Sequence, residues 1–192
     1  MKEEILTGTK AETLFELKNA GYNVLPLIYF TVAEWKSRQG EFIEKIQDKF
    51  QEKKLVIRSS ANAEDTAESS MAGVFDSVLN IECTSKGIMD GVKVVIDSYD
   101  DDQTNQILVQ PMVINVAMSG VVMTRSLDDG SPYYVVNYDD SSGLTDTVTG
   151  GTSINKTVYI YNGVDENDFD SPMLLSVLKL ARELEKKFVN IP

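Results

Sequence analysis

Histidine is absent from this chain of 192 residues, and cysteine occurs once, at Cys83. Without histidine, the chain cannot form Ser/His/Asp or Cys/His nucleophile pairs, nor a zinc site that uses histidine. A single cysteine excludes an intrachain disulfide, and we expect Cys83 to be a small buried apolar residue. These absences remove several common hydrolase and zinc-enzyme mechanisms from consideration.

Long apolar segments are also absent. No apolar run approaches the roughly 20 residues of a membrane-spanning helix, and the N-terminus lacks the apolar core of a secretion signal. We therefore expect a cytoplasmic protein with no membrane partner. With 42% hydrophobic residues, the chain can bury a core as one domain or as two small lobes.

Positive charge is scarce in the middle of the chain. The net charge is -12, and residues 59–180 contain five Lys/Arg against nineteen Asp/Glu. An acidic surface repels the phosphate backbone of nucleic acids, so we expect no nucleic-acid partner. A small phosphate ligand is compatible with this charge if a few well-placed cations and backbone N–H groups bind it.

Familiar phosphate and metal loops are missing too. The sequence has no G-x-x-x-x-G-K-[ST] and no G-x-G-x-x-G motif. The acidic cluster 100–102 lacks the glycine and glutamate of a calcium loop, and we expect it to be a solvated turn, like the pair Asp139 and Asp140. No residue of the chain is therefore assigned as a metal ligand.

Hydrophobic periodicity predicts an α+β fold. Thr31 and Glu34 form a predicted capping box, and Gly21 is a predicted helix end. The predicted helices cover residues 10–21, 31–50 with a break near Gly40, 85–99 and 171–188. The predicted strands cover residues 24–30, 54–58, 73–81, 105–113, 119–125, 132–138 and 157–161.

Arg58 ends an apolar strand and is followed by small and polar residues up to Ser70. One interpretation is an arginine that pairs with Glu64 or Asp65 beside a polar surface loop. The other is an anion-binding loop, in which small residues let the backbone approach a ligand and Arg58 supplies the charge. The residues alone leave both interpretations open.

Three segments occur in the order and spacing of a known family. "IRSSANAEDTAESSMAGVFDSVLNI" resembles V-R-S-S-A-x-A-E-D, F-A-G or M-P-G, and D-T-x-L-N of the phosphoenolpyruvate synthase and pyruvate phosphate dikinase family. "GTKAETLFELKNAGYNVLPLIYFT" is similar to its G-G-K-G-x-N-L-x-E-L and A-G-x-x-V-P-P-G-F-x-x-T. "ILVQPMVINVAMSGVVMTRS" is similar to its V-Q-x-M-V and S-G-V-x-F-T. The resemblance covers nearly the whole chain.

The resemblance implies a partial ATP-grasp-like domain over residues 1–192, with ATP and Mg²⁺ as cofactors. Such a domain holds ATP between two mixed α/β lobes, and the boundary between them falls near residues 110–116. In this family the segment that joins the lobes lies beside the adenine. By position, Gln110 and the backbone through Met112 fall on that segment.

The resemblance also implies residues that contact the phosphates. Lys10 and Arg58 match the family's lysine and arginine, and Gly73 and Ser77 fall on the glycine loop that covers the phosphates. Two convergent cations and backbone N–H groups can hold a polyphosphate in an acidic protein. Without the resemblance, Lys10 reads as a solvated residue in the first turn of its helix.

The chain departs from the family pattern at two motifs. Thr9 and Ala11 stand where the family has glycines, which predicts a less close approach of backbone to phosphate. Thr145 and Asp146 replace the glycine and glutamate of a downstream G-L-G-E motif.

The segment at the end of the chain resembles the one that precedes the family's D-I-E-W-A and L-Q-x-R strands. We therefore expect a domain that is incomplete at the C-terminus and inactive alone, since those strands bind metal and phosphates. In a full-length phosphotransferase it would deliver a phosphoryl group from MgATP to a histidine on a swivelling domain, and then to an acceptor such as pyruvate on another domain. The alternatives are a non-catalytic nucleotide-binding or interaction module, or the ATP domain of an antibiotic or glucan phosphotransferase.

Overall fold

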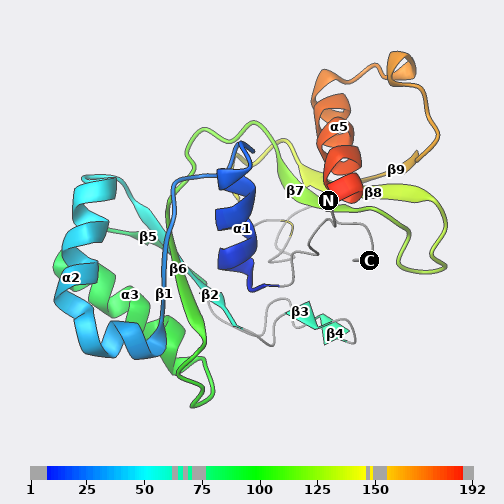
Figure 1. The fold of residues 1–192 in the computed structure, drawn as a ribbon. Coiled ribbons are helices and arrows are strands. Elements are labelled where there is room, and N and C mark those ends of the chain that lie inside the picture. Colours follow the sequence, from blue (N-terminus) through cyan, green and yellow to red (C-terminus); the bar gives the residue numbers. More distant parts are fainter. Residues whose placement is uncertain are drawn as a thin grey trace. The chain divides into compact units, whose positions relative to one another are not determined.

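The computed structural model describes residues 8–61, 65–66, 69–70, 77–145, 148 and 155–187, with the backbone alone for 65–66 and 69–70. The fold is mixed α/β with antiparallel sheets (Figure 1). The chain divides into two compact units, and the change from one to the other falls between Met112 and Val113. Each unit has its own sheet.

The first unit contains a four-stranded sheet in the order β1-β6-β2-β5, in which every neighbouring pair is antiparallel. Two helices connect its strands, α2 between β1 and β2 and α3 between β5 and β6, so the two β-α-β crossovers interleave. The strands are β1 (Ile28–Thr31), β2 (Leu55–Ser60), β5 (Ser77–Ile81) and β6 (Gln106–Pro111), and the helices are α1 (Lys10–Asn19), α2 (Val32–Phe50) and α3 (Ser85–Asp97). The strands β3 (Asp65–Thr66) and β4 (Ser69–Ser70) pair separately.

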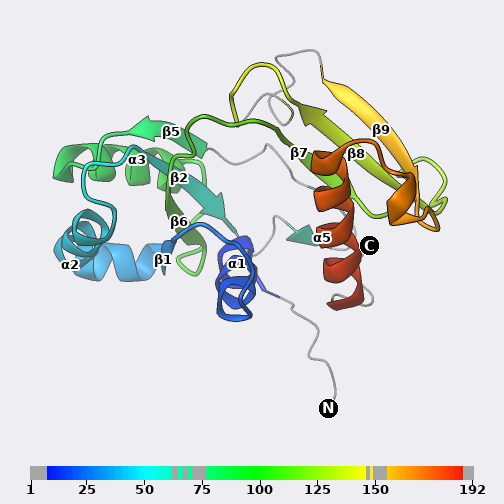
Figure 2. The ribbon, with the colours of Figure 1, turned by 90° about the horizontal axis from the view of Figure 1, so that it is seen from above.

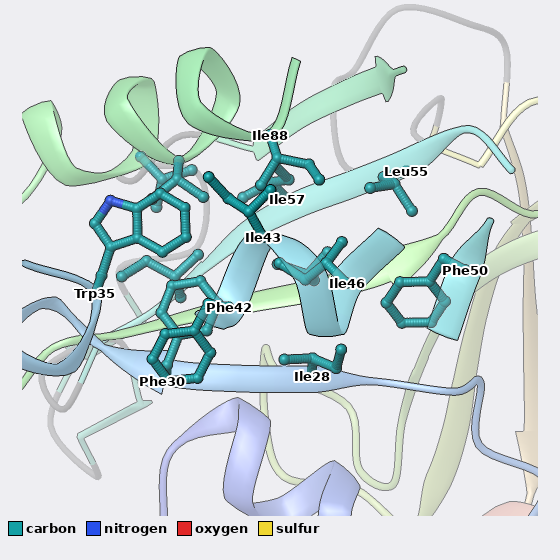
Figure 3. Close-up of a cluster of buried hydrophobic side chains, with 14 of the residues drawn as sticks. Ile28, Phe30, Trp35, Phe42, Ile43, Ile46, Phe50, Leu55, Ile57 and Ile88 are labelled. Atoms are coloured by element: carbon teal, nitrogen blue, oxygen red, sulfur yellow. The ribbon is translucent and has the colours of Figure 1, made fainter. Parts of the chain in front are cut away.

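The main core of the first unit lies between the sheet and the pair α2 and α3. Figure 3 shows the side chains that fill it, with Phe30 against Phe42 and Trp35, and Ile57 beneath Ile88. Alternate residues of β1, β2 and β6 point into this core because side chains alternate across a strand. The remaining strand residues therefore face α1, which lies on the opposite side of the sheet in Figure 1.

Capping explains where the helices of the first unit begin. The predicted capping box of α2 is confirmed: the N–H of Thr31 donates to Glu34 Oε2 at 2.9 Å, and the N–H of Glu34 donates to Thr31 Oγ1 at 3.1 Å. The predicted break in α2 is also present, but it lies at Arg38 (φ -136°, ψ 34°) and not at Gly40. Its guanidinium bonds Glu34 and lies over the ring of Phe42, and these contacts hold the kinked residue in place.

Two glycines have clear structural roles in this unit. Gly21 follows α1 with φ +90°, and its N–H donates to the carbonyl of Lys18 at 3.1 Å, which confirms the predicted helix end. Gly91 lies in the middle of α3, where a Cβ atom would come within 2.8 Å of Ile57 Cδ1. A residue that weakens an isolated helix is used here because it lets α3 lie close against β2.

Two expectations about single residues need correction or refinement. Strand β1 begins at Ile28 and not at residue 24, because Pro26 has no N–H to donate to a neighbouring strand. Cys83 is half-buried at the edge of the main core, and burial raises the pKa of its thiol. The predicted solvated turn at residues 100–102 is confirmed, since all three are exposed between α3 and β6.

The second unit is a three-stranded antiparallel sheet in the order β7-β8-β9 with one helix packed on it. Figure 2 shows α5 lying against one face of this sheet. The core between them contains Tyr134, Val136, Ile160, Leu178 and Ala181. The elements are β7 (Ser119–Met123), β8 (Tyr133–Asp139), β9 (Lys156–Tyr161), the 3₁₀ helix η1 (Glu166–Asp168), which periodicity did not predict, and α5 (Pro172–Lys187).

Close backbone packing and one buried carboxylate mark this second sheet. A Cβ atom at Gly120 would lie 2.4 Å from the carbonyl oxygen of Asn137, so only glycine fits this position of β7. Asp139 is 4% exposed, and it accepts hydrogen bonds from the N–H groups of Ser141 and Ser142 at 2.8 and 3.1 Å. The expected solvated pair was therefore wrong for Asp139, whose carboxylate closes a turn by accepting from the backbone of the residues that follow it. No helix within the described ranges is long and apolar enough to cross a membrane.

Candidate functional site

The candidate site lies on the sheet face of the first unit that is turned toward α1, here called the α1 face. The register of β2 against β6 places Val56 opposite Gln110, Arg58 opposite Leu108, and Ser60 opposite Gln106. Directly opposed residues of an antiparallel pair share a face. Leu108 packs on Ala11 of α1, which fixes the side of the sheet on which all six residues lie. The α1 face is defined by Val56, Arg58, Ser60, Gln106, Leu108 and Gln110.

Lys10 begins helix α1 at one end of this face. Its Nζ donates to the carbonyl of Ser59 at 3.4 Å, and Ser59 directly follows Arg58 in the chain. The helix is anchored there because the N–H of Ala11 donates to Ser60 Oγ at 2.9 Å. The structure therefore brings Lys10 to the part of β2 that carries Arg58, although the two lie 48 positions apart in the sequence.

Arg58 is a partly buried cation of the first unit with one unsatisfied donor. Its Nε atom is buried, and within the described ranges no acceptor bonds it. Burial lowers the pKa of the guanidinium from its ordinary value, although an arginine remains charged at neutral pH. Of the two acidic partners considered from sequence, Glu64 lies outside the described residues and the side chain of Asp65 is not described. A buried donor without an acceptor is costly unless a ligand supplies one.

The predicted glycine loop is described only in part. Ser77 begins β5 and lies directly opposite Arg58 in the β2–β5 register, with its side chain exposed. Opposed residues have Cβ atoms about 5 Å apart, so the Ser77 hydroxyl is a neighbour of the Arg58 stem. Gly73 lies outside the described residues.

The predicted adenine segment forms the other end of β6. Gln110 is buried and pairs with Val56, while the N–H of Met112 donates to the carbonyl of Lys54 at 2.8 Å. That N–H is therefore already used within the fold. Continuing the β1–β6 register past Ile28 and Val109 would bring Pro26 opposite Pro111, and neither proline has an N–H. The ladder ends at Val109, and the β1 side of residues 110–111 has no strand partner.

The two ends of the α1 face are separated by a strand segment of defined length. Ser60 pairs with Gln106 at the Lys10 end, and Val56 pairs with Gln110 at the other end. Four residues of extended chain correspond to about 13 Å. The face therefore has Lys10 at one end, Arg58 midway, and at the other end the part of β6 that continues past its pairing with β1.

A polar network at the start of α1 was missed by motif reasoning. Thr9 Oγ donates to Gln106 Oε1 at 2.6 Å, Gln106 Nε2 donates to Glu12 Oε1 at 2.7 Å, and the N–H of Thr9 donates to Glu12 Oε2 at 3.0 Å. Thr9 and Glu12 form a capping box whose T-x-x-E spacing was visible in the sequence. The contact with Gln106, 97 positions away, was not.

The network gives the departures at the first motif a structural role. Thr9 is the buried N-cap of α1, and Ala11 is fully buried against Leu108 and Leu27. In the downstream motif, Thr145 is described and partly buried, while Asp146 lies outside the described residues. Among the described residues, no group of three or more His, Cys, Asp or Glu side chains could hold a metal ion.

Comparison with protein families identifies the chain. A family model for the AMP/ATP-binding domain of pyruvate phosphate dikinase matches residues 3–169. The chain belongs to this family. Membership in the pyruvate phosphate dikinase AMP/ATP-binding family confirms the resemblance drawn from the three sequence blocks and supports ATP binding. A search of curated proteins found no match.

Proposed function

We propose that the chain is the nucleotide-binding part of a phosphotransferase related to phosphoenolpyruvate synthase and pyruvate phosphate dikinase, with ATP held in an ATP-grasp-like manner between two lobes. The observation that carries this proposal is Arg58, a cation whose buried Nε has no acceptor among the described residues. A phosphate oxygen is the acceptor that a guanidinium prefers, because the two groups match in charge and geometry. Membership in an AMP/ATP-binding family supports ATP as the molecule that carries this phosphate.

In this proposal the triphosphate lies at the Lys10 end of the α1 face. The ammonium of Lys10 and the guanidinium of Arg58 neutralise phosphate oxygens, and the exposed Ser77 hydroxyl beside Arg58 adds a neutral donor. Gly73, on the predicted phosphate loop, completes the set. Magnesium accompanies the triphosphate in this family, and no step is assigned to it here.

Adenine lies at the other end of β6 in the same proposal. An extended strand offers an acceptor and a donor at the spacing of a purine edge. Because the Met112 N–H is engaged by Lys54, the groups left for adenine are the Pro111 carbonyl and the Val113 N–H, with Gln110 beside them. This refines the predicted adenine contact from Met112 to its two neighbours.

Phosphoryl transfer requires an acceptor that this chain does not supply. Histidine is absent from the sequence, so the phosphohistidine of the family belongs to a separate swivelling domain in the proposal, and the final acceptor, such as pyruvate, to another. The ATP domain of an antibiotic or glucan phosphotransferase fits the same residues. We also propose a cytoplasmic location.

A second candidate function is a nucleotide-binding module without catalysis. The observation that favours it is the closed first turn of α1, whose Thr9, Ala11 and Glu12 N–H groups all donate to side chains of the protein. These groups are not available to a phosphate, so less of the charge on ATP is met by the protein than in a glycine-rich loop. A histidine domain added as a separate protein distinguishes the two functions. Its phosphorylation indicates a phosphotransferase, and ATP binding without phosphorylation indicates the non-catalytic module.

Calorimetric titration of ATP tests the proposed function. Arg58→Ala and Lys10→Ala should each weaken binding by about 1.5 to 3 kcal/mol, the usual worth of a hydrogen bond to a charged group. Arg38→Ala and Lys18→Ala are matched controls, since Arg38 pairs with Glu34 on the surface and Lys18 lies in the last turn of α1. CTP serves as the control nucleotide and should bind more weakly than ATP. Unchanged ATP affinity in both site variants contradicts the proposal.

A further inference from the structure

Three polar side chains, Thr9, Ser60 and Gln106, are buried at one end of the α1 face, with exposed fractions of 5%, 0% and 7%. They come from the N-cap of α1, the end of β2 and the start of β6. Burying polar groups is costly unless every donor and acceptor is satisfied, so a satisfied cluster fixes its neighbours in one arrangement. None of these three residues has been given a role in binding the nucleotide.

The hydrogen bonds of this cluster form a closed set. The carboxylate of Glu12 can only accept, so the Gln106 amide must turn its nitrogen to Glu12 and its oxygen to the Thr9 hydroxyl, as observed. Glu12 also accepts the N–H of Thr9, and the N–H of Glu12 donates to Thr9 Oγ1 at 3.3 Å. Thr9, Glu12 and Gln106 are therefore mutually oriented, and each bond depends on the other two residues.

The same cluster is tied to the strands beneath it. Ser60 Oγ accepts the N–H of Ala11, and the N–H of Ser60 donates to the Tyr99 hydroxyl at 2.9 Å. The Tyr99 hydroxyl donates in turn to the carbonyl of Gln106. Tyr99 thus bridges β2 and β6 where Ser60 and Gln106 pair, so the position of α1 is set relative to both strands.

We infer that Gln106, acting through Thr9 and Glu12, is a positioning residue for the phosphate site. It fixes the first turn of α1 on the sheet so that the Lys10 ammonium lies 3.4 Å from the Ser59 carbonyl, beside Arg58. The inference rests on the proposed function, because Lys10 and Arg58 must bind phosphate for their spacing to matter. Where the family has glycines, this chain has the hydrogen-bonded cap of Thr9, Glu12 and Gln106. This cap fixes the position of the Lys10 ammonium relative to Arg58.

The chain offers an exchange of partners as a test. Gln106→Glu alone brings two carboxylates into contact and should weaken ATP binding about tenfold or more, since a buried hydrogen bond is replaced by repulsion. Adding Glu12→Gln restores every bond with one direction reversed: the new amide donates to residue 106 and still accepts from the N–H of Thr9. ATP affinity of the double variant should return to within about threefold of wild type.

A matched control separates positioning from general stability. Thr9→Ala and Thr31→Ala remove the same kind of capping box from α1 and α2, so both should lower the melting temperature, and Thr9→Ala should lower it more because it also leaves Gln106 Oε1 without its donor. Only Thr9→Ala should weaken ATP binding, by about fivefold to tenfold.

The deciding measurement is ATP calorimetry on these variants beside thermal unfolding. The inference is supported if Gln106→Glu loses ATP affinity and the double variant regains it. Thr31→Ala should bind ATP as wild type does. It is overturned if Gln106→Glu and Thr9→Ala bind ATP like wild type, or if the double variant recovers thermal stability without recovering affinity. Absence of ATP binding by the wild-type chain is a different result, which removes the proposed function and this inference together.

Discussion

Each of the two units contains a partly buried arginine, and the two arginines are used in opposite ways. In the second unit, Arg182 Nη2 donates to the carbonyls of Asn162 and Val164, both at 2.8 Å, and Nη1 lies 3.5 Å from Glu166. In the first unit, the buried Nε of Arg58 has no acceptor within the described residues.

The two guanidinium groups differ in where they find acceptors: Arg182 bonds the protein itself, whereas the Nε of Arg58 has no acceptor among the described residues. Arg182 joins the segment after β9 to α5 and donates to acceptors of the protein through both Nη atoms, so its charge contributes to stability. Burying the guanidinium of Arg58 costs solvation free energy that no hydrogen bond at Nε offsets among the described residues, and burial lowers its pKa. A cation of the second kind on a sheet face with a second cation nearby is typical of a ligand site. The comparison rests on hydrogen bonding, because both residues are partly buried arginines within regular elements, Arg58 in β2 and Arg182 in α5.

Removing the structural arginine should have the largest effect. Arg182→Met leaves the carbonyls of Asn162 and Val164 without their donor and should lower the free energy of unfolding by about 3 kcal/mol. Lys179→Met is the control, since Lys179 contacts the same Glu166 through an exposed ion pair and should change stability by less than about 0.5 kcal/mol. Urea unfolding followed by circular dichroism measures both. Equal effects would mean that Arg182 is only a surface charge.

The second unit also contains a buried phenol whose titration should be measurable. The Tyr134 hydroxyl donates to Glu185 Oε2, and burial, together with this carboxylate, raises the pKa of Tyr134 to about 12. In the unfolded chain the phenol ionises near pH 10. The raised pKa in the folded protein therefore adds to the free energy of unfolding below pH 10, and this contribution is lost as the pH rises from about 10 to about 12. The loss should be on the order of 2 kcal/mol. Tyr134→Phe should remove this part of the pH dependence, and unfolding curves of both proteins from pH 9 to 12 test it.

Local features of the fold could be predicted from the sequence because their causes are local. Gly21 and the Thr31–Glu34 capping box determine helix ends through neighbouring residues, and strand alternation depends on the next residue but one. Even here the break in α2 was misplaced by two residues. Gly40 is the weaker helix former, but the contacts of Arg38 with Glu34 and Phe42 hold the non-helical residue.

The arrangement of the site depends on strand register, which local pattern does not contain. The alternation of β2 and β6 predicts that each strand has two faces, but not that Arg58 lies opposite Leu108 or that Gln106 reaches Thr9. The use of the Met112 N–H by Lys54 follows from the same register. Family resemblance made Lys10 and Arg58 candidates, and the structure adds that the buried Nε of Arg58 has no acceptor among the described residues.

The most direct test of the central claim is thermal unfolding of wild type and Arg58→Met with and without ATP, followed by the fluorescence of Trp35, the only tryptophan, in the core of the first unit. Without ATP, Arg58→Met should be the more stable protein, by about 1 kcal/mol, because an apolar side chain of similar length replaces a buried donor without an acceptor. With ATP, wild type should gain more stability than Arg58→Met by mass action, because the variant binds ATP more weakly. Two results would contradict the claim that Arg58 binds a phosphate of ATP through a donor that the protein leaves unsatisfied. One is a lower melting temperature of Arg58→Met than of wild type without ATP, and the other is an equal rise of the melting temperature with ATP in both proteins.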